Sequence, residues 1–371
     1  MRVRFLLPAA VLLLVSAVSG PLGAGQAAQP AIVSSEFIYD RGPYPQVHAS
    51  TLVETTSGQL LAAWFGGTEE GHPDVSIWVA RLEGGRWSPG VKVADGVQDA
   101  ATRHPTWNPV LFQPRGGPLH LFYKVGPSPR EWWGMVMTST DDGRTWSAPR
   151  RLPEGILGPI KNKPVQLADG TIVSGSSTEA AGSDAWRVHV ERSTDLGRTW
   201  ERVAVGDGGF NAIQPEILRH ADGRLQLLCR SKEMEVPTSW SSDGGRTWST
   251  LAKSGLYAVN SGSDAVTLQD GRHVLVYNYR DRPDGSPENY RPELLTGITN
   301  PPTGPRARWP LVVSVSRDGV AWKQAITLED APIRHGYAYP AVIQTRDGRI
   351  HVTYTFDRQK IKHVVIDPAK L

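Results

Sequence analysis

Short segments in which apolar and polar residues alternate recur along most of this chain, and this period of two is typical of half-buried β-strands. Six pairs of such segments flank a dipeptide that ends in glycine, which predicts a β-hairpin with a two-residue turn. The expected hairpins cover residues 49–65, 109–124, 164–176, 216–230, 264–277 and 341–355. No long segment shows the 3.6-residue period of a helix, so the pattern predicts an all-β fold.

A third strand is expected after each hairpin, over residues 75–81, 134–138, 187–192, 235–240, 311–315 and 361–366. A fourth strand is expected after every unit except the last, which ends with the chain. The segment 32–39 at the other end of the chain can supply that missing strand. Six units of four strands, with the two chain ends sharing one unit, predict a six-bladed β-propeller whose N-terminal strand closes the last blade.

The turns after the third strands carry a repeated motif, S-x-D-x-G-x-x-W. Complete copies occupy residues 139–146, 193–200 and 241–248, a shortened copy lies at 316–322, and residues 84–87 keep only the turn and the tryptophan. The aspartate can accept hydrogen bonds from a tight turn, the glycine supplies a positive φ, and the tryptophan folds back as an apolar plug. Successive copies start 54, 48 and 75 residues apart, which is the spacing of a repeat architecture, so we expect a structural role. The longest interval contains an insertion at 281–308, expected to be a loop over the fifth blade.

The N-terminus predicts export. Arg2 and Arg4 precede an apolar run at 5–18 and small residues at 24–28, which together are typical of a secretory signal peptide over residues 1–28. The apolar run is too short for a membrane span. We therefore expect a secreted or periplasmic protein in which residues 29–371 form a single propeller domain.

Composition narrows the function classes further. The chain has one cysteine, Cys229, which excludes an internal disulfide and lies in an apolar strand, where a buried side chain is expected. The net charge of +3 without a basic stripe argues against a nucleic-acid partner. No other long apolar run is present, so no membrane span is expected. We also expect a monomer that needs no cofactor.

One face of the predicted propeller collects polar residues. The loops that enter the first strands and the loops between second and third strands share this face, so function is expected there. Candidate residues are His48, His72, Asp74, His104, Trp107, Asn108, Lys161, Lys163, Glu216, Arg230, Tyr337 and Tyr339. Their charges are mostly positive, which favours an anion such as the carboxylate of an acidic sugar, and Trp107 or Tyr337 could form a platform for a sugar ring.

The three complete motifs resemble the Asp-boxes, or BNR repeats, of the sialidase superfamily, and the resemblance extends along nearly all of the mature chain. Sialidases use a tyrosine nucleophile assisted by a glutamate, together with an aspartate acid/base. The resemblance assigns these roles to Tyr339, Glu216 and Asp74. A tyrosine with its ordinary pKa of about 10 needs such a neighbouring base to act as a nucleophile.

Sialidases also hold the substrate carboxylate with three arginines. The resemblance assigns the second to Arg230 and the third to Arg306 or Arg308. The first arginine is replaced by His48, and the glutamate that would steady it is replaced by Thr355. Histidine cannot form the two parallel hydrogen bonds that arginine offers a carboxylate, so the sequence predicts a pocket that differs from that of sialidases.

A second chemistry remains open because His48, His72 and His104 all lie at blade entrances. The W-N-P and F-G-G-T-x-E segments resemble those of superfamily lyases that act on rhamnosyl-glucuronate ends of plant gums. In such an elimination, cations such as Lys161 and Lys163 would neutralise the uronate carboxylate, and His104 or Tyr339 would remove the C5 proton.

Two further alternatives are a metal site and a glycan-binding module. His72, Asp74 and His104 lack a compact ligand spacing, so no metal is predicted. A module that only binds glycan would not need the Tyr339–Glu216 pair, which favours an enzyme. The sequence thus predicts an exo-sialidase-like glycosidase that cleaves a terminal acidic sugar, with a uronate lyase and a non-catalytic binding propeller as alternatives.

Overall fold

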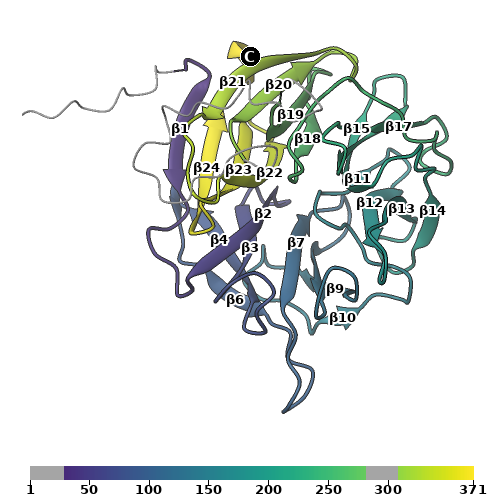
Figure 1. Ribbon diagram of the computed structural model, residues 1–371. Coiled ribbons are helices and arrows are strands. Elements are labelled where there is room, and N and C mark those ends of the chain that lie inside the picture. The colour runs from purple at the N-terminus through teal and green to yellow at the C-terminus, as the bar shows by residue number, and fades with distance from the viewer. Residues whose placement is uncertain (1–28, 281–307) are drawn as a thin grey trace, which may run out of the picture.

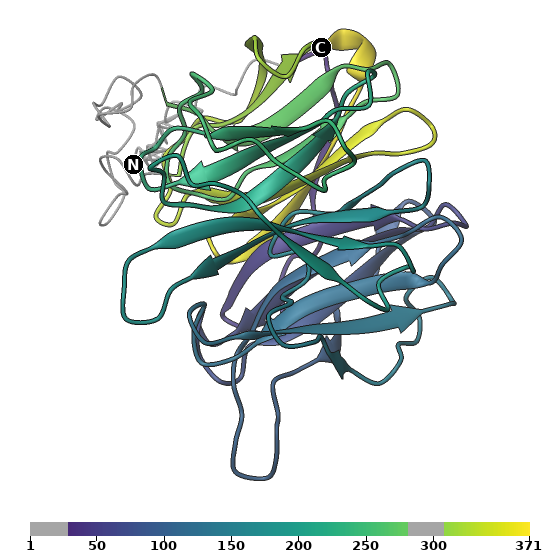
Figure 2. The same ribbon diagram turned by 90° about the vertical axis from the view of Figure 1, so that its right-hand side faces the viewer.

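Six antiparallel sheets surround a central axis in the computed structural model (Figure 1), which describes residues 29–280 and 308–371. The predicted signal peptide and residues 281–307 of the predicted insertion lie outside the described residues. Seen from the side, the sheets follow one another around the ring (Figure 2). The predicted six-bladed β-propeller is confirmed.

The blades follow the order of the chain. Blade 1 contains β2 (Gln46–Glu54), β3 (Leu60–Gly67), β4 (Ser76–Glu83), β5 (Arg86–Trp87) and β6 (Val91–Ala94). Blade 2 contains β7 (Thr106–Phe112), β8 (Leu119–Val125), β9 (Trp133–Ser139) and β10 (Arg150–Arg151). Blade 3 contains β11 (Val165–Gln166), β12 (Ile172–Glu179), β13 (Trp186–Ser193) and β14 (Glu201–Ala204).

The second half of the ring is built in the same way. Blade 4 contains β15 (Ala212–Arg219), β16 (Leu225–Ser231) and β17 (Thr238–Ser241). Blade 5 contains β18 (Asp264–Thr267), β19 (His273–Asn278), β20 (Leu311–Ser316) and β21 (Trp322–Glu329). Blade 6 contains β22 (Tyr337–Gln344), β23 (Ile350–Phe356), β24 (Lys360–Ile366) and β1 (Ile32–Phe37), and a 3-10 helix, Pro368–Lys370, follows.

The ring closes as the sequence predicts. Strand β1 pairs antiparallel with β24, from Ile32 opposite Ile366 to Phe37 opposite Lys362, so both ends of the described chain lie in one blade (Figure 1). Among the described residues, no helix has the length and apolarity needed to cross a membrane.

Two details of the predicted strands are wrong. The hairpin turns hold three residues, not two: the N–H of Leu167 bonds to the carbonyl of Thr171, and Gly170, with φ of 90°, ends the turn. Glycine is required there because the third residue of such a loop adopts the left-handed conformation. The predicted fourth strand of blade 4 is also wrong, because the described chain forms only isolated bridges there, between Thr238 and Ala252 and between Glu235 and Tyr257.

The Asp-box motifs are turn staples, as expected. In the first copy, Asp141 accepts hydrogen bonds from the backbone N–H of Thr145 at 2.9 Å and from its hydroxyl at 2.6 Å. The hydrogen bond from the Thr145 side chain is the largest of the contacts that lower the pKa of Asp141 to about 2. The next residue, Asp142, accepts a hydrogen bond from Ser57 in the β2–β3 turn, so the motif lies at the end of the blades where the first and second strands meet.

We expect Asp243→Ala, in the third copy, to destabilise the fold without changing the functional site. Asp243 accepts hydrogen bonds from the backbone N–H groups of Arg246 and Thr247, each at 2.9 Å. Their loss should lower the free energy of unfolding by about 1–2 kcal/mol, as loss of a capped turn does. Urea unfolding measures this change. A variant of normal stability that has lost its activity would place the functional face at the wrong end of the propeller.

The apolar core lies between neighbouring blades. Leu61 of blade 1 and Leu121 of blade 2 are fully buried in one cluster, and the Asp-box tryptophan Trp146 packs against it. Cys229 on β16 is buried in another such cluster, as predicted. Packing between blades therefore fixes where each inner strand, and the loop that enters it, stands around the axis.

Buried histidines make this core sensitive to acid. His351 and His363 share a hydrogen bond of 2.9 Å, and burial lowers the pKa of each to about 4. The unfolded chain has a histidine pKa of about 6.5 and takes up protons first as the pH falls, so this part of the stability is present above pH 6.5 and is lost between about 6.5 and 4.

We therefore expect the urea midpoint to fall between about pH 7.5 and about pH 5. The double variant His351→Gln, His363→Gln should show a smaller fall, since it removes two of the groups that take up protons. An equal fall in the double variant would contradict this assignment.

Candidate functional site

Four of the inner strands carry the same irregularity where they enter the ring. The register shifts by a bulge after His48 in β2, and also in β7, β15 and β22. Each bulge contains one non-glycine residue with a positive φ: Ala49, Asn108, Gln214 and Tyr339. Bulges redirect side chains, and left-handed backbone at non-glycine residues is concentrated at functional sites, so these strand ends are candidates for function.

Tyr339 lies at the centre of this group and is 8% exposed. Its hydroxyl accepts hydrogen bonds from Arg230 Nη1 at 2.8 Å and from Gln214 Nε2 at 3.2 Å. No described residue accepts the proton of this hydroxyl group. Gly262 lies against the ring, and a Cβ there would come within 3.2 Å of Tyr339, Gln214 and Lys161. The phenol oxygen is thus held by donors while its own proton is available.

Arg230 is fixed on two sides. Its Nε donates to Asn260 at 2.6 Å, its Nη1 also donates to Gln214 at 3.3 Å, and its guanidinium lies 5.2 Å from the ring of Trp186. None of the described residues forms an ion pair with it. The contacts therefore orient a guanidinium that has no ion-pair partner in the described part of the chain.

A second unpaired guanidinium, that of Arg308, lies 5.7 Å from the Tyr339 ring. Burial, together with the charges of Arg230 and Arg358, lowers the pKa of Arg308 to about 10, so the group stays charged at neutral pH but would be stabilised by an anion. Like Arg230, it has no carboxylate partner among the described residues. Two cations that converge on one tyrosine, without a carboxylate partner within 29–280 and 308–371, make this position a candidate anion site.

His48 and Thr355, the two departures from sialidases, are hydrogen-bonded to each other. His48 Nδ1 lies 3.0 Å from Thr355 Oγ1, and the imidazole ring stands 4.2 Å from the Tyr339 ring. Burial, and then the charges of four cations led by Arg358, hold the pKa of His48 well below its ordinary value. His48 is therefore neutral, and its Nε2 is buried without a partner in the described chain.

Glu216 does not contact Tyr339 in the described structure. Its carboxylate accepts hydrogen bonds from Asn162 at 3.1 Å and Ser263 at 3.0 Å. Burial, and after it the charge of Asp264, raises the pKa of Glu216 to about 8. The physical reason for the separation is the β15 bulge. It turns Gln214 towards the tyrosine, while Glu216 lies two residues further along the strand.

The two candidate lysines are held by contacts with other parts of the protein. Lys161 is buried and donates to the carbonyls of Ser263 and Pro340, which keeps its Nζ 5.8 Å from the Tyr339 ring. Lys163 forms a 2.9 Å ion pair with Asp264. Both ammonium groups are used by the protein, so a role in binding the substrate carboxylate does not fit their contacts.

Asp74 and His72 lie together on the β3–β4 loop. Their side chains form a pair at 2.8 Å with 41% and 45% exposure, and the Thr68 hydroxyl also donates to Asp74 at 2.7 Å. Burial raises the pKa of Asp74, but these contacts outweigh it and lower the pKa below its ordinary value. The exposed pair is accessible from solvent at the end of the propeller that carries the arginines.

Four other candidates occupy positions that do not fit a role in substrate binding or catalysis. Tyr337 is 1% exposed and its hydroxyl donates to Ala331, while Trp107 is buried and donates to Gly126, so neither offers a platform. Asn108 donates to Ile160 and so joins two blades. His104 packs against Trp133 and contacts none of the described residues around Tyr339. Arg306 lies outside the described residues.

Three residues at the site do not appear among the sequence candidates. Gln214 binds Tyr339, Trp186 holds Arg230, and Arg358, in the β23–β24 turn, accepts a hydrogen bond at its carbonyl from the N–H of Val47 beside His48. The rule that second-to-third-strand loops face the site, applied to blade 6, would have found Arg358. Gln214 is one of the polar residues at the blade entrances in the sequence, but its contact with Tyr339 depends on the bulge.

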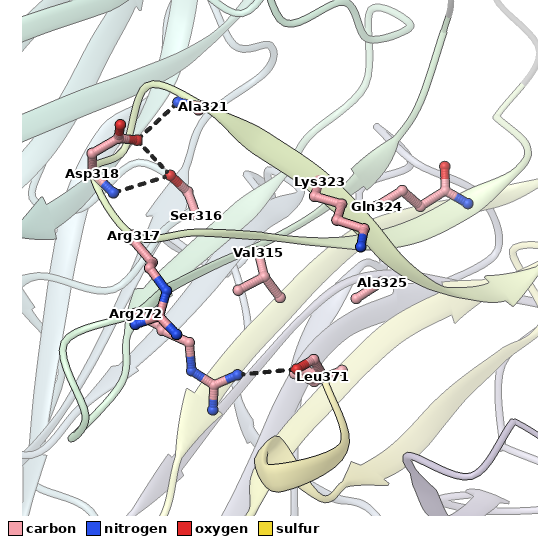
Figure 3. A pocket seen from close by; sticks show the side chains of 10 residues that line it. All are labelled: Arg272, Val315, Ser316, Arg317, Asp318, Ala321, Lys323, Gln324, Ala325 and Leu371. Atoms are coloured by element: carbon pink, nitrogen blue, oxygen red, sulfur yellow. Dashed lines mark hydrogen bonds between the residues drawn. The ribbon is translucent and has the colours of Figure 1, made fainter.

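A large hollow lies away from these residues. It has a volume of about 620 Å³ and is lined by Arg272, Arg317, Lys323 and the C-terminal Leu371 on blade 5 (Figure 3). Arg272 is already bonded to the carbonyl of Leu371 and to Asp270. No candidate site residue lines this hollow. Elsewhere within 29–280 and 308–371, no group of three or more His, Cys, Asp or Glu side chains is arranged to hold a metal.

The comparisons with known proteins agree with this architecture. A solved structure of a protein of unknown function from Dyadobacter fermentans has a TM-score of 0.70 at 18% identity, covering 91% of this chain and 98% of that one. An intramolecular trans-sialidase from Ruminococcus gnavus has a TM-score of 0.66 at 14% identity, over 93% of this chain and 99% of that one. The NanB sialidase from Streptococcus pneumoniae has a TM-score of 0.64 at 12% identity, over 91% and 71%.

No curated protein matches the sequence. The BNR repeat-like domain family, however, matches residues 58–352, which is well over half of the chain. These residues include the three complete Asp-box motifs as well as Tyr339 and Arg230. The protein therefore belongs to the BNR repeat-like domain family, and its six-bladed propeller has the fold seen in solved structures of sialidases.

Proposed function

We propose that this protein is an enzyme that binds the carboxylate of a terminal acidic sugar at Arg230 and Arg308 and cleaves the adjoining glycosidic bond with Tyr339 as a reacting group. The observation that carries the proposal is the convergence of two guanidinium groups, neither paired with a carboxylate of the described chain, on one tyrosine. A bound carboxylate would neutralise both charges and lie next to the phenol oxygen.

Hydrolysis by a sialidase-like route is the first form of this function. Tyr339 would attack the anomeric carbon, and Asp74 on the β3–β4 loop, as the acid/base, would give a proton to the leaving-group oxygen. The similarity of the fold to sialidases and to a trans-sialidase supports this form. It requires a base for the tyrosine, and Glu216 would have to exchange its present partners to serve as one.

Elimination is the second form, and the position of His48 favours it. A neutral imidazole lies beside the Tyr339 ring, and its Nε2 has no partner in the described chain. In this reaction the arginines would neutralise a uronate carboxylate, and Tyr339 or His48 would remove the C5 proton. The bond from C4 to its oxygen would then break, leaving a C4=C5 double bond, while the leaving group takes up a proton.

Product analysis tests the proposal and separates the two forms. The purified protein would be incubated with sialosides and, separately, with glycans that end in rhamnosyl-glucuronate. Release of free sialic acid supports hydrolysis, and absorbance from an unsaturated uronate supports elimination. Binding of these glycans without a product would indicate a propeller that only binds glycan. The absence of both binding and product would contradict the proposal.

A further inference from the structure

The pair formed by His48 and Thr355 leaves one side of the anion site without a charge of its own. His48 is neutral and buried, and Thr355 carries no charge. The hydrogen bond between them satisfies Nδ1 of the imidazole and leaves Nε2 free. Any cation on this side of Tyr339 must therefore come from another part of the chain.

Arg358 is next to this position. Its carbonyl oxygen accepts a 2.8 Å hydrogen bond from the N–H of Val47, the residue before His48. Its side chain is 17% exposed and turns to the β3–β4 loop, where Nη1 forms a 2.5 Å ion pair with Glu70. Only Nη1 has a partner among the described residues, so Nε and Nη2 remain available as donors.

The backbone at Arg358 is strained. Asp357 and Arg358 form the tight turn between β23 and β24, and both are left-handed, with φ of 51° and 59°. Such turns favour asparagine and glycine, and the left-handed conformation is unfavourable for arginine. Strain of this kind at a strand end next to a charged cluster indicates that the side chain is kept for function.

The electrostatics agree with this geometry. After burial, the charge of Arg358 is the largest influence that lowers the pKa of His48, ahead of Arg308 and Arg230. Arg358 also contributes to the lowered pKa of Arg308. The backbone also places Arg358 near Arg308, because the N–H of Asp357 bonds to the carbonyl of Gly336 and the N–H of Tyr337 bonds to the carbonyl of Arg308.

We propose that Arg358 supplies the third guanidinium of the anion site and binds the carboxylate of the acidic sugar together with Arg230 and Arg308. The resemblance to sialidases implies an arginine in blade 1 at position 48 and a glutamate in blade 6 at position 355, where this chain has His48 and Thr355. The structure instead has Arg358 in blade 6 and Glu70 in blade 1, so the charged pair is reversed between the same two blades. The inference rests on the proposed function, because it assigns a further ligand to the same carboxylate.

Binding of glucuronic acid and N-acetylneuraminic acid, each compared with its methyl ester by calorimetry, tests the inference. Arg358→Gln should weaken binding of the acid preferred by the unmodified protein about 10-fold or more and leave its ester unchanged, because only the acid offers a charge. Arg358→Lys should fall between the two, since it keeps the charge but not the second N–H donor. The melting temperature of each variant shows that it is folded.

Glu70→Gln separates a ligand role from a role in holding the loop. It removes the ion pair but keeps the Arg358 charge, so acid binding should change by no more than about 2-fold. Equal losses in Glu70→Gln and Arg358→Gln, for acid and ester alike, would show a purely structural role and overturn the inference. In the Arg358→Gln background, adding His48→Arg and Thr355→Glu should restore the preference for the acid.

The outcomes also separate this inference from the proposed function. If Arg230→Gln abolishes the preference for the acid and Arg358→Gln does not, the assignment of Arg358 is wrong while the proposed function stands. If the unmodified protein does not distinguish either acid from its ester, carboxylate recognition is wrong and both proposals fall with it.

Discussion

Replacing Tyr339 with phenylalanine should reduce turnover of the cleaved glycan by at least about 10³-fold, because the proposed reaction uses its hydroxyl group as the nucleophile in hydrolysis or, where Tyr339 removes the C5 proton, as the base in elimination. The ring that packs against His48 and lies close to Arg308 is kept, so binding of the acidic sugar should change much less. The measurement is single-turnover kinetics together with the dissociation constant of a non-cleaved acid.

Tyr337→Phe provides the matched control. Tyr337 is two residues away on the same strand, and its hydroxyl donates to the carbonyl of Ala331, so its loss should lower stability by about 1 kcal/mol and spare turnover. Normal turnover in Tyr339→Phe would remove this residue from the chemistry and leave the arginines as a binding site only.

Two further variants distinguish hydrolysis from elimination. If Tyr339 is a nucleophile assisted by Glu216, Glu216→Gln should cost nearly as much as Tyr339→Phe because the two groups act as a unit. If the reaction is an elimination, His48→Ala should cost about 10²-fold or more and Glu216→Gln far less. His104→Ala should be mild in both cases, because His104 packs against Trp133.

The fold was predictable because its signals are local and repeated. Alternation with a period of two gives each strand, and the Asp-box turn of each copy is held by contacts within seven or eight residues, as the bonds from Thr145 to Asp141 show. Closure by β1 followed from counting strands. The three-residue turns were missed because two kinds of loop can end in the same dipeptide. A two-residue loop and a three-residue loop with a left-handed glycine at its end cannot be distinguished from that dipeptide alone.

The site was predictable only in part, because its decisive features are set by the bulges. Sequence reasoning found Tyr339, Arg230, Arg308 and His48, which the structure brings together. It could not tell that the β15 bulge turns Gln214 to the tyrosine in place of Glu216. A shift of one residue in an inner strand exchanges which side chain faces the axis, and no local pattern in the sequence records that shift.

The predicted ligand-binding roles of the lysines and aromatic residues do not fit their contacts, for a related reason. These side chains are suited to a sugar carboxylate or a sugar ring, but in the structure they form contacts between blades. Lys163 is paired with Asp264, and the ring of Trp107 is buried between blades. In a propeller, polar residues at a strand entrance can either join two blades or face a ligand, and only the position of the neighbouring blade decides between these roles.

Arg230→Lys should weaken binding of the acidic sugar by about 10-fold or more, the second-largest effect that we expect. The ammonium keeps the positive charge but cannot at the same time donate to Asn260, to Tyr339 and to a carboxylate, as the guanidinium can. The loss should appear in the dissociation constant of the acid and disappear for its methyl ester, which carries no charge for the arginine to bind.

Arg224→Lys is the matched control for this substitution. Arg224 stacks on Trp240 and pairs with Asp222 in the hairpin turn before β16, so the same change there should leave binding of the acid intact. Turnover by Arg230→Lys should fall further than binding alone accounts for, because the lysine also gives up the 2.8 Å bond that orients the Tyr339 hydroxyl. If Arg230→Lys binds acid and ester as the unmodified protein does, the carboxylate lies elsewhere, and the two guanidinium groups around Tyr339 serve another anion.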